Sequence, residues 1–115
     1  MDEHVFTLGI EEEFQLIDPE TRELRSHIQQ IIKGGKTILQ EQLKAELHQS
    51  IVELGTCICN DARAAREEVI RLRSGLAALA ETQGLKIASA GTHPFSHWMD
   101  QLITRHDDRP GARNA

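Results

Sequence analysis

The N-terminal part of the chain alternates apolar and polar residues with the period of two that is typical of a β-strand. From Phe6 to Leu16 the even positions are apolar except for Glu12, whereas the odd positions include Glu11 and Glu13. We therefore expect a strand over residues 5–17, with a core face at the even positions and a polar face at the odd positions. Glu12 is a charged misfit on the expected core face.

The rest of the chain predicts further strands around one clear helix. Turn-forming residues at 18–21 follow the first strand, and β-branched residues favour a second strand over residues 50–56. Residues 43–49 fit either a helical turn or a strand. Asn60 or Asp61 caps the helix, and Gly84 stands where a helix-terminating glycine belongs. The apolar stripe of the helix consists of Ala65, Val69, Leu72, Leu76 and Leu79.

After this helix the pattern predicts a strand over residues 85–90, a loop over residues 91–95 and a short helix from Ser96 to Ile103. The charged residues along the long helix, Arg71 and Arg73 among them, are interpreted as a solvated face. Cys57 and Cys59 form a C-x-C pair, which we interpret as small buried thiols.

Composition limits the chain to one domain of 115 residues. The net charge of -5 and the pI near 5.6 argue against nucleic-acid binding. Neither a membrane-spanning apolar run nor a signal-peptide pattern is visible, so we expect a soluble, cytoplasmic protein without a membrane partner. Only 3% of the residues are aromatic, and none is tyrosine. This is little for a self-contained core and suggests a part of a larger unit.

Glu11 and Glu13 are the first candidates for chemistry. Two carboxylates two residues apart on a strand lie about 6–7 Å apart at Cα. They can reach one hard cation, or two cations bridged by phosphate. The alternative is a solvated strand face, and Gly9 favours a site because strand glycines mark bulges or close backbone approach.

Glu46, Glu53 and His93 are further candidates. If residues 46–53 were one extended strand, their odd spacing would put the two glutamates on opposite faces, and a bend would reunite them. Solvated or rim-exposed acids are the alternative, although Glu53 lies among apolar residues and needs a partner there. His93 and His97 form H-x-x-x-H, but Pro94 interrupts the helix that a zinc site of this spacing requires.

Three co-ordered segments resemble one known family. They are Phe6–Asp18, which contains G-I-E-E-E-F, Ser50–Thr56 followed by Cys59, and G-T-H-P-F at residues 91–95 followed by Trp98. Their order and spacing are similar to those of the glutamate–cysteine ligase type 2 family of carboxylate–amine ligases.

The resemblance implies an α+β, glutamine-synthetase-like domain whose antiparallel sheet and helices form a site for ATP and Mg²⁺ or Mn²⁺. The implied reaction couples the γ-carboxylate of glutamate to cysteine through an acyl-phosphate. It also implies metal ligation by Glu11, Glu13, Glu46 and Glu53, with Glu12 at an intervening position that tolerates apolar residues. Thr92 and His93 match a loop that is either substrate-facing or structural. Catalytic and nucleotide-contacting residues are not identified.

Family members are several-fold longer than this chain. We therefore expect residues 1–106 to form the N-terminal part of an incomplete catalytic domain, with residues 107–115 as a disordered tail. Little or no ligase activity is expected from the chain alone. The substrates must be positioned by an opposite wall of the site, and we expect the incomplete domain to lack that wall. Amino-acid substrates and ATP are the expected partners. The alternative is a non-catalytic acidic domain that binds metal or self-associates through exposed sheet edges.

Overall fold

The computed structural model describes residues 5–26, 31, 33–34, 39, 42–45, 50–97 and 99. The predictions for Glu46 and for the tail at residues 107–115 lie outside these residues. Of the helix predicted from Ser96 to Ile103 only residues 96, 97 and 99 are described, and Ser96 and His97 are not helical. The elements described are β1 (Glu11–Ile17), β2 (Leu43–Ala45), β3 (Ile51–Gly55), α2 (Ala62–Thr82) and β4 (Lys86–Ala88).

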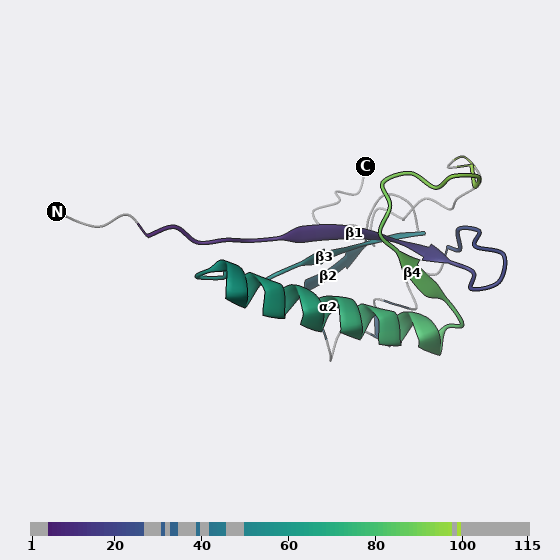
Figure 1. The fold of residues 1–115 in the computed structure, drawn as a ribbon. Coiled ribbons are helices and arrows are strands. Elements are labelled where there is room, and N and C mark those ends of the chain that lie inside the picture. The colour runs from purple at the N-terminus through teal and green to yellow at the C-terminus, as the bar shows by residue number, and fades with distance from the viewer. Residues whose placement is uncertain are drawn as a thin grey trace, which may run out of the picture.

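The strands form one antiparallel sheet in the order β2-β3-β1-β4. Helix α2 lies along one face of this sheet (Figure 1). This architecture confirms the α+β expectation, while the glutamine-synthetase-like fold stays a prediction. No helix in the described part of the chain combines the length and the apolar character needed to cross a membrane.

Both ends of α2 follow the predicted signals. The Asp61 carboxylate accepts a hydrogen bond from the Ala64 backbone N–H at 2.8 Å, which satisfies a free donor of the first turn. Beyond the last helical residue, Thr82, the chain turns at Gly84, whose φ of +69° is accessible to glycine at little cost. The helix therefore begins and ends where the sequence indicates.

The core lies between α2 and the sheet face that it covers. Phe14 and Leu16 of β1 are 3% and 0% exposed, which confirms that the even positions of this strand face the core. A buried apolar stripe of the helix packs against them. The core residues of β3 and α2 are Val52, Leu54, Leu72, Leu76, Leu79 and Ala80.

The first strand is shorter than predicted, because it begins at Glu11 instead of residue 5. Its partner β3 ends at Gly55, so the preceding residues keep only scattered pairing, chiefly a bridge between Leu8 and Cys59. Without a covering layer, Phe6 is 76% exposed although it belongs to the apolar set of positions. The alternation therefore does not decide burial along the whole segment, since Gln15 and Ile17 are only 4% and 8% exposed on the face that α2 does not cover.

The structure decides between two alternatives that the sequence left open, and it corrects the interpretation of one cysteine. Residues 43–45 and 51–55 form two antiparallel strands, so they are not parts of one extended strand and the alternative of a bend holds. The cysteines also differ from one another. Cys59 is buried, whereas Cys57 is exposed, because it lies just beyond the end of β3.

Candidate functional site

Glu13 and Glu53 lie directly opposite each other on β1 and β3. The Leu16 N–H donates to the Ser50 carbonyl at 2.8 Å, and the Thr56 N–H donates to the Ile10 carbonyl at 2.9 Å. Ladder hydrogen bonds alternate along antiparallel strands, so Glu13 and Glu53 form a non-hydrogen-bonded pair, in which Cα atoms are about 4.5 Å apart. The closest kind of cross-strand position thus carries two carboxylates.

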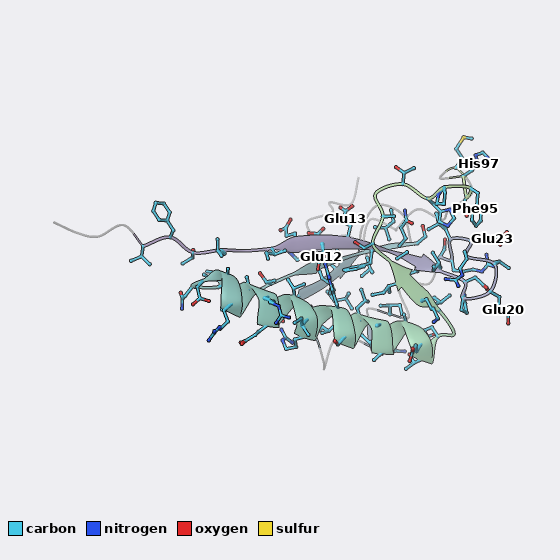
Figure 2. All side chains as sticks on the ribbon, viewed as in Figure 1. Glu12, Glu13, Glu20, Glu23, Phe95 and His97 are labelled. Carbon is cyan, nitrogen blue, oxygen red and sulfur yellow. The ribbon has the colours of Figure 1, made fainter. Side chains whose placement is uncertain are left out.

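Glu11 and Lys44 extend this pair into a charged surface. Glu11 lies opposite Gly55 and shares the face of Glu13, as the period of two predicted. Lys44 lies opposite Glu53 on the other side of β3. We call the surface formed by Glu11, Glu13, Glu53 and Lys44 the acid face. It is the face of the sheet that α2 does not cover, and Figure 2 shows Glu13 pointing away from the helix.

A hollow of about 480 Å³ opens at one end of the acid face. Gly9 and Gly55 form part of its wall, and a Cβ atom added to either would meet no heavy atom within 4 Å. The missing side chain at Gly55 leaves open space between the strands that carry Glu11 and Lys44. The hollow is lined by Gly9, Ile10, Glu11, Gln42, Lys44, Gly55 and Thr56.

Glu12 lies on the opposite side of β1 and binds α2 (Figure 2). The Arg73 guanidinium donates to both carboxylate oxygens of Glu12, from Nε at 2.8 Å and from Nη2 at 2.5 Å. This hydrogen bonding raises the pKa of Arg73 above its usual value. Arg73 thereby neutralises the charged misfit of the core face. Its side chain is 53% exposed, so the interpretation as part of a solvated face is confirmed, and the ion pair with Glu12 is what that interpretation did not foresee.

Glu68 anchors a second polar network on α2, near the hollow. Its carboxylate accepts hydrogen bonds from Arg71 Nε at 3.0 Å and from Gln42 Nε2 at 2.8 Å. These bonds lower the pKa of Glu68 to about 2. The Gln42 amide also donates to the Gly55 carbonyl at 3.2 Å, so the network ties the helix to the end of β3. A hydrogen bond to Glu68 in turn raises the pKa of the Cys57 thiol, which keeps it protonated.

His93 fastens the loop after β4 to the turn after β1. Its Nδ1 accepts hydrogen bonds from the backbone N–H groups of Phe95 at 3.2 Å and Ser96 at 2.9 Å. The proton therefore belongs on Nε2, which donates to the Arg22 carbonyl at 2.6 Å. Both ring nitrogens are engaged within the protein, and this arrangement favours the structural alternative for His93. Thr92 is exposed.

The donor chemistry of the acid face suits a hard divalent cation. Glu11, Glu13 and Glu53 offer carboxylate oxygens, and Mg²⁺ commonly uses one or two protein carboxylates together with substrate phosphates and water. Within the described residues no group of three or more His, Cys, Asp or Glu side chains could hold a metal ion by itself. Glu46 lies outside those residues, so the four-glutamate site stays a prediction.

The sequence interpretation missed Lys44, Arg73 and Glu68. Glu12 carried a usable signal, because a carboxylate on a core face needs a cationic partner, and α2 is rich in arginine. Lys44 carried none, because its place opposite Glu53 depends on the register of a strand whose existence was uncertain.

Comparison with known proteins supports the resemblance. The family model of glutamate-cysteine ligase family 2 (GCS2) matches residues 7–111. A protein of Chloroflexus aurantiacus named "Putative glutamate–cysteine ligase 2" is 63% identical over 99 residues, which cover 86% of this chain and 25% of the relative. Relatives of the same name from Herpetosiphon aurantiacus and Sorangium cellulosum are 59% and 54% identical, over 89% and 86% of this chain and 26% and 27% of their own length. The chain thus spans about a quarter of the length of these relatives.

Proposed function

The chain belongs to glutamate–cysteine ligase family 2, and from this premise we propose that it forms part of the active site of an ATP-dependent carboxylate–amine ligase. The observation that carries the proposal is the Glu13–Glu53 pair on the sheet face that α2 does not cover, with Glu11 beside it. Carboxylate oxygens that neighbouring strands bring side by side are the donors that a hard divalent cation takes. A ligase that uses ATP and a divalent cation provides one.

The proposed reaction joins glutamate to cysteine. The γ-carboxylate of glutamate takes the terminal phosphoryl group of ATP and releases ADP. The amine of cysteine then attacks the resulting acyl-phosphate, forms the amide bond, loses a proton and displaces phosphate. Glutamate–cysteine ligase is the activity in the names of the relatives, and the chain's contribution would be to hold the phosphate end of ATP over the acid face.

Glu13 and Glu53 would hold the Mg²⁺ or Mn²⁺ ion, with Glu11 next to them and Glu46 as the further predicted ligand. A bound divalent cation would neutralise negative charge on the phosphate oxygens during transfer. Arg73 contributes from the other side of β1, because its bond to Glu12 holds the strand with Glu11 and Glu13 facing outward.

We expect little or no ligase activity from the 115 residues alone. Phosphoryl and acyl transfer depend on the alignment of two substrates, and this chain does not match about three-quarters of the relative's length. ADP release from the isolated chain that depends on glutamate and cysteine would contradict this expectation.

The metal site is tested by titrating the chain with Mn²⁺ and following the free ion by electron paramagnetic resonance. We expect saturable binding that Glu13→Gln and Glu53→Gln each abolish. Glu20→Gln is the matched control, because Glu20 is an exposed carboxylate in the turn after β1 (Figure 2). Binding that survives both substitutions, or that is equally weakened by the control, would refute the site.

The ligase reaction is tested in a chimera. The matched segment of the Chloroflexus aurantiacus relative is replaced by residues 7–97 of this chain, which lie inside the region matched by the family model. We expect ADP release that requires glutamate, cysteine and a divalent cation, and that Glu13→Gln removes. A folded but inactive chimera, next to an active parent relative, would contradict the proposal.

A second candidate function, self-association, is favoured by one observation. Val5 and Phe6 are 80% and 76% exposed. Ile58, which follows the end of β3 at Gly55, is 77% exposed. Residues 5–10 carry no charge, and an exposed extended segment of this kind can pair with another copy. We expect Phe6→Lys to shift any dimer seen by size-exclusion chromatography to monomer. A wild-type chain that stays monomeric at high concentration rules this function out.

A further inference from the structure

The even and odd residues of the β1 segment turn their backbone groups to different sides of the strand. The Leu8 N–H donates to the Cys59 carbonyl at 2.8 Å. Further along the strand, the Leu16 N–H donates to the Ser50 carbonyl at 2.8 Å. The N–H and C=O of one strand residue point to the same side, and successive residues alternate between the two sides. The even residues therefore pair toward β3, and the odd residues turn their backbone groups toward the β4 side.

Strand β4 covers only the C-terminal end of this second side. It consists of Lys86–Ala88 and pairs with residues 15–17 of β1, which runs on alone toward the N-terminus (Figure 1). Within the part of the chain that the structure describes, no backbone hydrogen bond reaches Gly9, Glu11 or Glu13 from the β4 side. We call the backbone groups of these three residues the open edge. It is a row of unpaired donors and acceptors of the kind that accepts another strand.

The side chains next to the open edge also lack full cover. Leu8 and Ile10 are 44% and 36% exposed, although they share the set of positions that is buried further along the strand. A Cβ atom added at Gly9 would meet no heavy atom within 4 Å, so the space around the edge is free. A neighbouring strand places its Cβ atoms about 4.5–5.5 Å from those of the residues opposite. One added strand would therefore supply both the backbone partners and the apolar cover.

We propose that the open edge is the docking site of a β-strand from the part of the ligase sequence that this chain does not cover. The matched segment makes up 25% of the Chloroflexus aurantiacus relative, so about three-quarters of that sequence is available to supply the strand. The added strand would lie in line with β4 and continue its hydrogen bonds along β1, which is the strand-addition mode of recognition. This inference depends on the family and on the geometry of β1, and not on the reaction proposed above.

The charges at the edge disfavour a second copy of the chain as the occupant. A second β1 would bring its own Glu11 and Glu13 to the acid face, and like charges on neighbouring strands are destabilising. The net charge of -5 also makes two copies repel each other. The strand that fits has neutral or basic residues opposite Glu11 and Glu13, and apolar residues beside Leu8 and Ile10.

Amide hydrogen exchange, followed by NMR in the dilute 115-residue chain, tests whether the edge is open. We expect the Glu13 N–H to exchange about tenfold or more faster than the Gln15 N–H, because β4 pairs with Gln15 and stops short of Glu13. Gln15 is the matched control, since its N–H lies on the same side of the same strand. Equally slow exchange of the two amides would show that the edge is already paired, and would overturn the proposal.

The same exchange measurement in the chimera that carries residues 7–97 tests the occupant. By mass spectrometry of fragments that cover β1, we expect exchange at Gly9, Glu11 and Glu13 to slow by about tenfold or more relative to the isolated chain. Unchanged exchange in a folded chimera would overturn the docking site. Slowing that appears in the isolated chain as its concentration rises would assign the edge to a second copy, and would overturn the proposed occupant.

Gly9→Pro blocks the edge directly. Proline removes the N–H of the open edge and puts its ring where the added strand would approach. The φ angle of Gly9 lies outside the left-handed region, and its N–H has no described partner, so the isolated chain should keep its melting temperature. The chimera should melt several degrees lower, whereas the control Gly9→Ala, which keeps the N–H, should change neither protein. An equal effect of proline in both proteins would overturn the proposal.

The outcomes also separate this inference from the proposed function. A folded chimera whose edge is protected but which releases no ADP would contradict the ligase reaction and leave the docking site in place. An active chimera whose edge amides exchange as fast as in the isolated chain would overturn the docking site only.

Discussion

The two faces of β1 put the same residue type to opposite uses. Glu12 points toward α2, where Arg73 neutralises it with two hydrogen bonds. Glu13, the next residue, points the other way and meets the carboxylate-bearing Glu53 instead. One face pairs a partly buried carboxylate with a cationic partner, and the other brings two carboxylate residues opposite each other.

The difference shows where stability and function reside. The covered face combines apolar burial with an internal ion pair, and it can hold the strand in register. The acid face places the carboxylate residues Glu13 and Glu53 opposite each other, and the proposed function assigns them to a cation. Because strand side chains alternate, a slip of one residue would exchange the two faces entirely. Substitutions on either face should therefore have different and separable consequences.

The largest effect is expected in the core beneath the sheet. Leu76 of α2 is fully buried, so Leu76→Ala should lower the free energy of unfolding by about 2–5 kcal/mol. Ile70→Ala is the matched control on the same helix, because Ile70 is 47% exposed, and its effect should stay within about 0.5 kcal/mol. Urea denaturation followed by circular dichroism measures both. Equal losses would show that α2 does not pack as described.

A smaller effect is expected from the ion pair that marks the covered face. Arg73→Met leaves the Glu12 carboxylate without its described partner and should lower the melting temperature by a few degrees. Glu12→Leu should restore the stability of the Arg73→Met variant, because an apolar residue at a core-facing position can replace an ion pair. Arg66→Met, which removes an exposed charge from the same helix, is the control. A double variant as unstable as Arg73→Met would contradict this role of Glu12.

The sequence predicted the faces of β1 better than the partners that act across them. Alternation separated Glu12 from Glu11 and Glu13, because it depends only on local backbone geometry. The Glu13–Glu53 contact required the register between β1 and β3, to which residues far apart in sequence contribute. Lys44 was missed for the same reason, and the burial of Phe6 was wrongly expected because no local signal marks where the helix stops covering the sheet.

Acid should weaken the network that joins α2 to the end of β3. The pKa of Glu68 is lowered from 4.5 to about 2 by Arg71 and Gln42. The charged form is thus favoured in the folded state, so this stabilisation is complete above the unfolded value and is lost as the pH falls toward 2. Glu68→Gln should flatten the decline in melting temperature over this range. The same decline in Glu68→Gln and wild type would contradict the assignment.

The smallest effect, and the one most specific to the comparison, is a gain of stability on the acid face. Glu13→Gln removes one of two like charges that lie opposite each other, so without divalent cations it should raise the free energy of unfolding by about 0.2–1 kcal/mol. Added Mn²⁺ should stabilise the wild type and not the variant, which reverses their order, because only a complete carboxylate pair gains from the cation. Urea denaturation with and without Mn²⁺ measures this reversal. A loss of stability in the metal-free variant would mean that Glu13 is already neutralised within the protein, as Glu12 is, and that the two faces of β1 do not differ in the way described.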